Sequence, residues 1–330
     1  MHPTSPSTNL HRQRGLTLVE LMVAMLIGLV LLAAVGTIFL SSKSAFVSSD
    51  QRGRVHESGR LTADVVGAMT RQAGYVDIAN TTSPDYQAIV FDDVAKRATT
   101  GIVPVFACRG GRINFTTVPW SCTPNAVVPG VPPSDSIAFS YQSQPASPLV
   151  QGSTLLPFGG GFGGDCNGNN PMPSSAMGTS TMPVDTPIAI NEYYVARNIA
   201  TTQGGSTVYI PELYCRGNGA PGTAQPFAQG VEQLRVRFAV TDAFSWNPKL
   251  WETDADGVSS TDWDKVQAVE ICAVTLSPAR TQGSGLSTTA QVYKDCDGVD
   301  QTPADTRLRK ATYFRFNLRN RTNTASSIIF

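Results

Sequence analysis

The hydrophobic positions of this chain follow three patterns along its length. Residues 16–40, "LTLVELMVAMLIGLVLLAAVGTIFL", form an apolar run in which Glu20 is the one charged residue. Residues 41–75 are amphipathic, and the remainder carries short β-branched or alternating runs separated by Gly, Pro, Ser and Asn. These patterns predict a long N-terminal helix followed by a β-rich head.

The amphipathic segment continues the helix that the apolar run begins. Apolar or small residues recur there at three- and four-residue spacing, as in a helix packed on one side, and Gly74 is a typical terminator. We expect one helix from about Leu16 to Ala73, its first half transmembrane and its second half packed on a sheet. Its charges are interpreted as a solvated face, with a partner-helix groove as the alternative. The recurring positions are Val55, Thr62, Val65, Val66, Met69 and Ala73.

The remainder of the chain predicts an α+β fold with a mainly antiparallel sheet and long loops stapled by disulfides. One predicted strand is apolar on both faces, as in the centre of a sheet. Residues 142–187, rich in Gly, Pro, Ser and Asn, are expected to form an irregular insertion anchored at Cys166. The predicted strands are 136–141, 188–196, 206–215, 232–240, 266–276 (apolar on both faces) and 313–319.

Composition changes this picture mainly by what it excludes. The 330 residues have a formal net charge of zero, so the chain as a whole does not attract nucleic acid or anionic lipid. The three histidines are His2, His11 and His56. Two of them precede Gly15, and a chain with one histidine is poorly equipped for Ser-His-Asp or Cys-His catalysis. We therefore expect a protein that is not an enzyme and needs no cofactor.

Six scattered cysteines indicate disulfides in an oxidising compartment. Because short loops close more easily, the favoured pairs are Cys108–Cys122 and Cys272–Cys296, which leaves Cys166–Cys215.

The apolar run reaches about 37 Å as a helix, enough to cross a hydrocarbon layer of about 30 Å. Arg12 and Arg14 precede it, so the N-terminus is expected in the cytoplasm and the head outside. An ionised carboxylate in this setting costs about 2.5 kcal/mol or more. Lys43 is the first cation after Glu20, and cleavage after Gly15 would create a nearer one, the amine of Leu16.

The segment "GLTLVE" (15–20), with basic residues before it and an apolar helix after it, resembles the class III signal of type IV pilins and pseudopilins. The resemblance implies that a prepilin peptidase cuts after Gly15 and N-methylates Leu16. It also implies that Glu20 docks against the terminal amine of a neighbouring subunit. The expected divisions are a leader at 1–15, a transmembrane or filament-core helix at 16–40, its amphipathic continuation at 41–75, and a periplasmic head at 76–330.

Four segments of the chain are similar to the PilW family of minor pilins. This resemblance implies an inner-membrane subunit that primes type IV pilus assembly at the pilus tip and supports adhesion and twitching motility. The implied partners are other minor pilins, the major pilin and a large tip adhesin. The segments are "RLTADVVGAMTRQAGY" (60–75), "GVEQLRVRFAVTD" (230–242), "WDKVQAVEICAVTLSPAR" (263–280) and "TYFRFNLRNR" (312–321).

Other functions remain open at this point. The related J-type pseudopilins of type II secretion share the same signal, and a signal-anchored periplasmic enzyme is a third class. The arginines near the C-terminus, interleaved with aromatic residues, also fit a DNA-uptake pilin. A plainer interpretation is an edge strand with phenylalanines inward and arginines outward. A chain beginning at Leu16 would have a formal charge of −2, which does not favour DNA.

One loop, "DADGVSSTD" (254–262), offers Asp254, Asp256 and Asp262 as calcium ligands. Counted as an EF-hand, it has Ser259 and Lys265 where glycine and an acidic residue belong. Asp-Gly turn formation is the plainer interpretation, and it applies equally to the related "DCNGN" (165–169) and "DCDGVD" (295–300).

Overall fold

The structure is a computed structural model. It describes residues 17–75, 103–116, 119–124, 133–143, 164–171, 188–203, 206–241, 250–278, 291–303 and 305–320.

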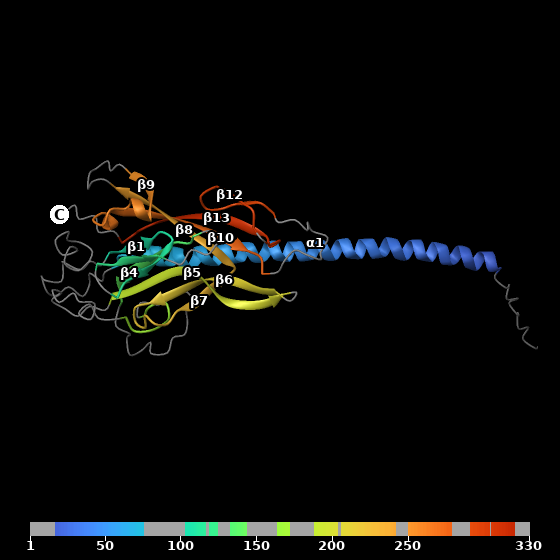
Figure 1. The fold of residues 1–330 in the computed structure, drawn as a ribbon, viewed down its shortest axis with the longest axis horizontal. Helices are drawn as coiled ribbons and strands as arrows, with labels where there is room; N and C mark the ends of the chain where they lie inside the picture. Colours follow the sequence, from blue (N-terminus) through green and yellow to red (C-terminus); the bar gives the residue numbers. More distant parts are fainter. Residues whose placement is uncertain are drawn as a thin grey trace, which may run out of the picture.

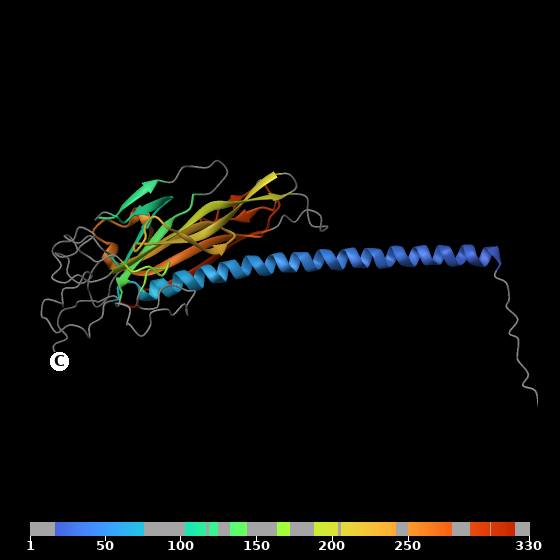
Figure 2. The same ribbon diagram turned by 90° about the horizontal axis from the view of Figure 1, so that it is seen from below.

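In the first described range, residues 17–75, the chain forms a single helix, α1 (Leu18–Gln72). It starts after Thr17 and stops at Ala73, so the expected continuous helix is confirmed. Gly74 follows with a φ of 73°, a conformation that favours glycine, and a Cβ there would lie 3.1 Å from the Asn320 carbonyl oxygen. The second half of α1 runs along the head, whereas the first half projects from it as a free rod (Figures 1 and 2).

The described part of the head contains two larger antiparallel sheets and two short strand pairs. The five-stranded sheet has the order β1 (Val105–Cys108), β4 (Ser136–Gln142), β5 (Ile188–Gln203), β6 (Ser206–Gly217), β7 (Gln225–Gln229). The four-stranded sheet has the order β13 (Arg309–Asn317), β10 (Val266–Leu276), β8 (Val231–Thr241), β9 (Leu250–Asp254). The short pairs are β2 (Gly111–Asn114) with β3 (Ser121–Pro124), and β11 (Tyr293–Lys294) with β12 (Asp300–Gln301).

All six predicted strands are present, and the antiparallel pairing is confirmed. The apolar strand β10 lies between two neighbours, as expected, and β13 is an edge strand. Other features differ from expectation. Strands β1, β2, β3, β7, β9, β11 and β12 lie outside the predicted segments, and β13 begins at Arg309 rather than at residue 313. The strands divide into two principal sheets rather than one, and β5 extends to Gln203 instead of ending near residue 196.

One core joins the helix to both sheets. Val66 and Met69 of α1 are buried together with Phe139 of the five-stranded sheet and Ile271 of the four-stranded sheet. The six positions predicted to face inward, five in α1 and Ala73 directly after it, are all buried. The helix also bonds directly to a strand, because the Thr275 hydroxyl donates to the Val55 carbonyl oxygen at 3.0 Å. The second half of α1 is therefore an integral part of the head.

Candidate assembly site and the stapled head

The start of α1 is closed by a reciprocal pair of hydrogen bonds. The Glu20 N–H donates to Thr17 Oγ1 at 3.3 Å, and the Thr17 N–H donates to Glu20 Oε2 at 3.3 Å. This is a capping box, in which two backbone donors without intrahelical partners are satisfied by two side chains. The negative carboxylate also lies at the positive end of the helix dipole.

The capping box gives Glu20 partners that the sequence analysis missed. Its signal was readable, because Thr-x-x-Glu immediately before an apolar run is the pattern of a capping box. Gly15 and Leu16, the predicted cleavage site, lie outside the described residues. The structure therefore shows how Glu20 is held within one chain. Its pairing with a terminal amine stays a prediction.

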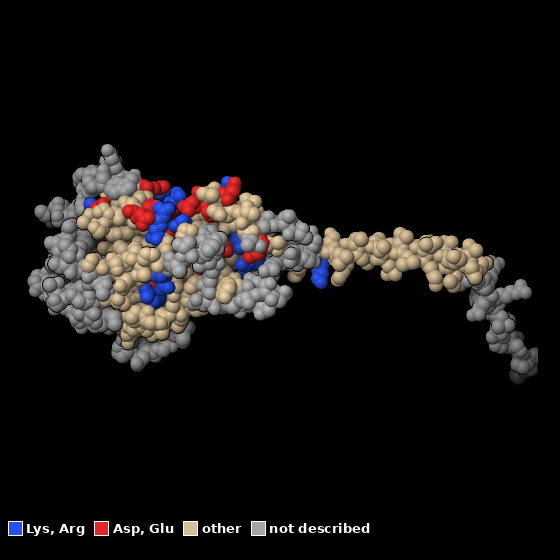
Figure 3. Space-filling view, viewed as in Figure 1, with Lys and Arg blue, Asp and Glu red and all other residues tan. Residues whose placement is uncertain are grey.

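Within the part of the chain that the structure describes, nothing covers the apolar surface of α1 beyond this cap. An 18-residue window of the helix has a mean hydropathy of 2.7, and none of that window is buried. Leu29 is 66% exposed and Leu32 is 71% exposed. In Figure 3 this free segment lacks charged side chains almost throughout. Such a continuous apolar surface needs lipid or other helices around it.

The described head contains three disulfides. They join Cys108 to Cys122, Cys166 to Cys215, and Cys272 to Cys296, with Cα–Cα distances of 5.5, 6.4 and 5.6 Å. These are the pairs that loop length favoured, and the pairing prediction is confirmed. Each bond links a strand of the head to a neighbouring strand or turn.

The turn at 165–169 presents Cys166 to the five-stranded sheet. Asp165 Oδ1 accepts hydrogen bonds from the N–H groups of Asn167 at 3.0 Å and Asn169 at 2.9 Å. Gly168 has a φ of 76°, as this turn requires. The Asp165 N–H donates to the Asn169 carbonyl oxygen at 2.9 Å and closes the loop.

The turn at 295–299, between β11 and β12, repeats this arrangement and is linked by its cysteine to β10 of the four-stranded sheet. Asp295 Oδ1 accepts from the N–H groups of Asp297 and Val299, both at 2.9 Å, and Gly298 has a φ of 76°. Cys296 occupies the place of Cys166. In both Asp-Cys-x-Gly segments, the aspartate side chain accepts hydrogen bonds from backbone N–H groups. Each segment therefore forms a turn, in agreement with the plainer interpretation.

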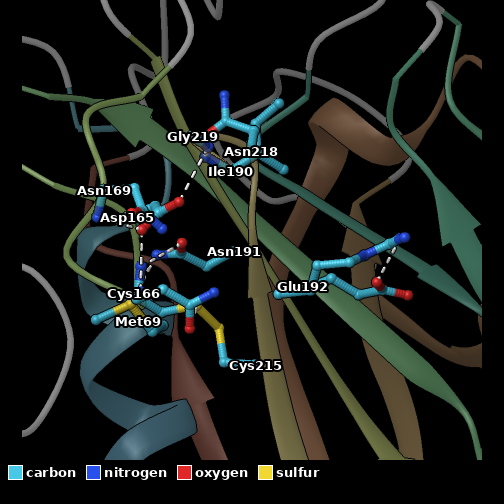
Figure 4. The surroundings of a disulfide bond; sticks show 12 residues. Met69, Asp165, Cys166, Asn169, Ile190, Asn191, Glu192, Cys215, Asn218 and Gly219 are labelled. Atoms are coloured by element: carbon cyan, nitrogen blue, oxygen red, sulfur yellow. Dashed lines mark hydrogen bonds and ion pairs between the residues drawn. A yellow bond between two sulfur atoms is a disulfide. The ribbon is translucent and has the colours of Figure 1, made fainter. Parts of the chain in front are cut away.

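The Cys166–Cys215 staple is connected to the helix through a buried amide (Figure 4). The Cys166 N–H donates to Asn191 Oδ1 at 2.8 Å, while Asn191 Nδ2 lies 3.6 Å from Met69 Sδ. Asn191 is fully buried, so both contacts are shielded from water. These contacts therefore connect the five-stranded sheet and its Cys166–Cys215 disulfide to α1.

The aspartates proposed for calcium have other partners. Asp254 accepts a hydrogen bond from the Gly257 N–H at 3.1 Å and forms an ion pair with Arg109. Asp262 pairs with Lys265 at 2.7 Å. Within the described residues, no three Asp, Glu, His or Cys side chains gather as a metal cluster would require. The geometry supports turn formation at this loop.

The arginines near the C-terminus are mostly paired with carboxylates. A charged row crosses the four-stranded sheet in register, with Arg315 beside Glu270, Glu270 beside Arg237, and Arg237 beside Asp254. Arg315 also pairs with Glu252 of β9. Figure 3 shows basic and acidic side chains intermixed over this part of the head. The pairing reduces the positive charge that could attract a phosphate backbone.

A second cluster of paired charges is largely buried at the start of β13. Arg309 contacts Asp305 at 2.6 Å and Glu232 at 2.6 Å, and Arg307 contacts Asp305 at 2.7 Å. Burial alone would raise the pKa of Asp305, but the hydrogen bond from Arg309 and the charges of both arginines outweigh it. The pKa is lowered from 3.8 to about 2.

Comparisons with known proteins agree with this architecture. Residues 192–320 match the PilW family, described as Type IV Pilus-assembly protein W, and residues 10–36 match the prokaryotic N-terminal methylation motif. No curated protein sequence matches the chain. A type IV-like pilin from Thermus thermophilus is similar at 12% identity, covering 81% of this chain and 96% of that one, with a TM-score of 0.32. That TM-score is too low to define a common fold.

A methylation motif, an exposed apolar helix behind it and a disulfide-stapled antiparallel head are features of type IV pilins, and the apolar helix fits an N-terminal membrane anchor. Residues 192–320 of the chain match the domain of the PilW pilus-assembly proteins. Pilins are structural proteins that associate with other pilins. The methylation match spans Gly15, Leu16 and Glu20, the three residues on which the predicted processing and assembly depend.

Proposed function

We propose that this chain is a minor pilin that primes assembly of a type IV pilus and lies at its tip. The free apolar half of α1, which opens with the methylation motif, is the observation that carries the proposal. A monomer cannot bury that surface by itself. Lipid covers it before assembly, and the helices of other pilins cover it afterwards.

In this proposal, a prepilin peptidase removes residues 1–15 and methylates the new amine of Leu16. The carboxylate of Glu20 then attracts the terminal amine of a neighbouring subunit, because both groups leave water for an apolar helix bundle. Methylation keeps the positive charge of the amine. This charge pair sets the axial register of the subunit in the filament.

The head faces the periplasm until the subunit enters the filament. The basic leader keeps the N-terminus in the cytoplasm, and the three disulfides suit an oxidising compartment. Its partners are other minor pilins, the major pilin and a large tip adhesin. Through them the subunit supports adhesion and twitching motility.

Mass spectrometry of the mature N-terminus tests this proposal. Protein isolated from cells with the prepilin peptidase should begin at an N-methylated Leu16, and protein from cells without the peptidase should retain Met1. Sheared surface pili should contain the processed form. A processed N-terminus at any other residue, or full activity of a chain that retains Met1, would overturn the proposal.

A further inference from the structure

A small cavity lies where the end of α1 meets the head, and neither the family match nor the proposed assembly role accounts for it. Its volume is about 270 Å³. Seven residues line it: Arg71 and Gln72 from α1, Tyr75 just after α1, Tyr141 and Gln142 from β4, and Arg319 and Asn320 from the segment after β13.

The two arginines of this cavity differ from the others in the head. No ion pair joins Arg71 or Arg319 to an acidic side chain of the described residues, and both are exposed. A cation near a helix C-terminus has a favourable dipole interaction, which suits Arg71 but not Arg319. By contrast, every other arginine after residue 103 whose side chain the structure describes has a carboxylate partner. These are Arg109, Arg112, Arg216, Arg235, Arg237, Arg307, Arg309 and Arg315.

The cavity also contains an unused hydrogen-bond acceptor. Gln72 Oε1 is buried and has no hydrogen-bond partner among the residues that the structure describes. Leaving a buried polar atom unsatisfied destabilises the folded state. A ligand that brings an N–H or O–H donor to this atom would remove this destabilisation. The residues that line the cavity thus include two arginines and a glutamine with an unsatisfied acceptor.

The walls of the cavity are held in place by contacts on several sides. Asn320 Nδ2 donates to the Arg71 carbonyl oxygen at 2.8 Å, which ties the last segment to the end of α1. The Tyr141 hydroxyl donates to the Gly164 carbonyl oxygen at 3.0 Å and accepts from Asn191 Nδ2 at 3.2 Å. A site whose walls are already fixed loses little entropy when a ligand binds.

We propose that this cavity is a binding site for a carboxylate-bearing ligand that also carries an amide N–H. The carboxylate would be received by Arg71 and Arg319, since guanidinium groups match carboxylates in geometry, and the N–H would reach Gln72. Such a ligand is an N-acylated acidic amino acid, either free or as part of another protein. Arg71 lies about 46 Å beyond Leu40 along the helix, so the site is far from the membrane segment.

The full-length protein in detergent micelles can be titrated with N-acetylglutamate, with N-acetylglutamine as the neutral analogue, and with inorganic phosphate as a second anion. Saturable binding of N-acetylglutamate alone is expected. Arg71→Gln and Arg319→Gln should each weaken it by about tenfold or more, as expected for loss of a charge-assisted hydrogen bond. Gln72→Glu should weaken it too, because the new carboxylate would occupy the arginines. Arg60→Gln, on the same helix but paired with Asp64, is the matched control and should bind normally.

Absence of saturable binding in wild-type protein with a native near-UV spectrum would overturn the proposal. Equal binding of phosphate, or equal loss in Arg60→Gln, would also contradict a carboxylate site.

A photoreactive phenylalanine at Tyr75, which lines the cavity, distinguishes in cells between a free small molecule and a segment of another protein as the ligand. A protein adduct that Arg319→Gln abolishes identifies an acidic protein segment. Binding of N-acetylglutamate without any adduct identifies a free small molecule. Neither result depends on processing at Gly15 or on filament assembly, so the proposed function is tested separately.

Discussion

Gly67 lets α1 approach the four-stranded sheet closely. A Cβ at this position would lie 2.5 Å from Cε1 and 2.6 Å from Cζ of the Phe316 ring. We therefore expect Gly67→Ala to destabilise the head by about 1–3 kcal/mol, because the ring must move within a packed core. Denaturant unfolding of the full chain in detergent, followed by near-UV circular dichroism, measures this loss.

Gly53 supplies the control for that substitution. It lies in the same helix with open space around its Cα, so Gly53→Ala meets no atom within 4 Å. Alanine has the higher helix propensity by about 1 kcal/mol, so this variant should be as stable as wild type or slightly more stable. Equal destabilisation by both substitutions would show that the contact with Phe316 does not limit the packing.

Asp305 should make the head sensitive to acid. Its pKa falls from 3.8 to about 2 on folding, so the ionised form favours the folded state. The resulting stabilisation, about 2 kcal/mol, is complete above pH 4 and disappears as the pH falls through 2. Asp305→Asn should thus be less stable than wild type at pH 6, with the difference shrinking toward pH 2. A difference that does not vary with pH would contradict this account.

Residue-scale features were predictable where they depend on local spacing. The burial of Val66 and Met69 follows from helical periodicity alone, and the capping role of Glu20 could have been read from Thr17 three positions earlier. The close fit of Gly67 could not be predicted, because Phe316, the residue it accommodates, is distant in sequence. Only the tertiary fold brings the two together.

At the scale of elements, the three disulfides should differ in their contribution to stability. Cys108 and Cys122 are 14 residues apart, and Cys166 and Cys215 are 49 apart. In the chain-entropy account, the longer loop constrains the unfolded chain more, by about 1 kcal/mol. Replacing Cys166 and Cys215 by serine should therefore lower the free energy of unfolding more than replacing Cys108 and Cys122. Urea unfolding of the two double variants checks the order.

Exposure gives a second, independent order for the same bonds. Cys122 lies on the exposed strand β3, whereas Cys215 and Cys272 are buried in their sheets. Under a mild thiol reductant, the Cys108–Cys122 bond should open first, because a thiolate must reach a sulfur atom to exchange. Mass mapping of alkylated cysteines over time shows the sequence of opening. Earlier opening of Cys272–Cys296 would mean that the head unfolds locally at β10.

A strand could be predicted when its own residues show a clear hydrophobic pattern. Strand β10 is apolar on both faces and β8 alternates cleanly, and both appear where the pattern placed them. The short strands β1, β2, β3, β7, β9, β11 and β12 were missed, since two to five residues hold too little pattern. The division into two sheets depends on which strands pair across the core, and no single segment encodes that choice.

At the scale of the whole molecule, α1 does two different things along one continuous rod. From Gln51 onward its inner face is buried in the head, and before that point its apolar surface is free. The buried half fixes the direction in which the free half leaves the head (Figure 2). Any force or register set by helix packing in a filament is thus transmitted directly to the stapled sheets.

The two possible roles of Glu20 can be separated by a pair of substitutions. Glu20→Gln keeps a side chain that can complete the capping box but removes the negative charge. Thr17→Ala removes the side-chain cap, at a cost of about 1 kcal/mol, but keeps the charge.

If Glu20 pairs with the amine of a neighbouring subunit, Glu20→Gln should lower the amount of this subunit in sheared pili by about tenfold or more, because a charged hydrogen bond of about 1.5–3 kcal/mol is lost. Thr17→Ala should stay within about twofold of wild type. Equal membrane levels and equal cleavage after Gly15 are the controls for both variants. The reverse order, with Thr17→Ala depleted and Glu20→Gln normal, would mean that the carboxylate serves only to start the helix.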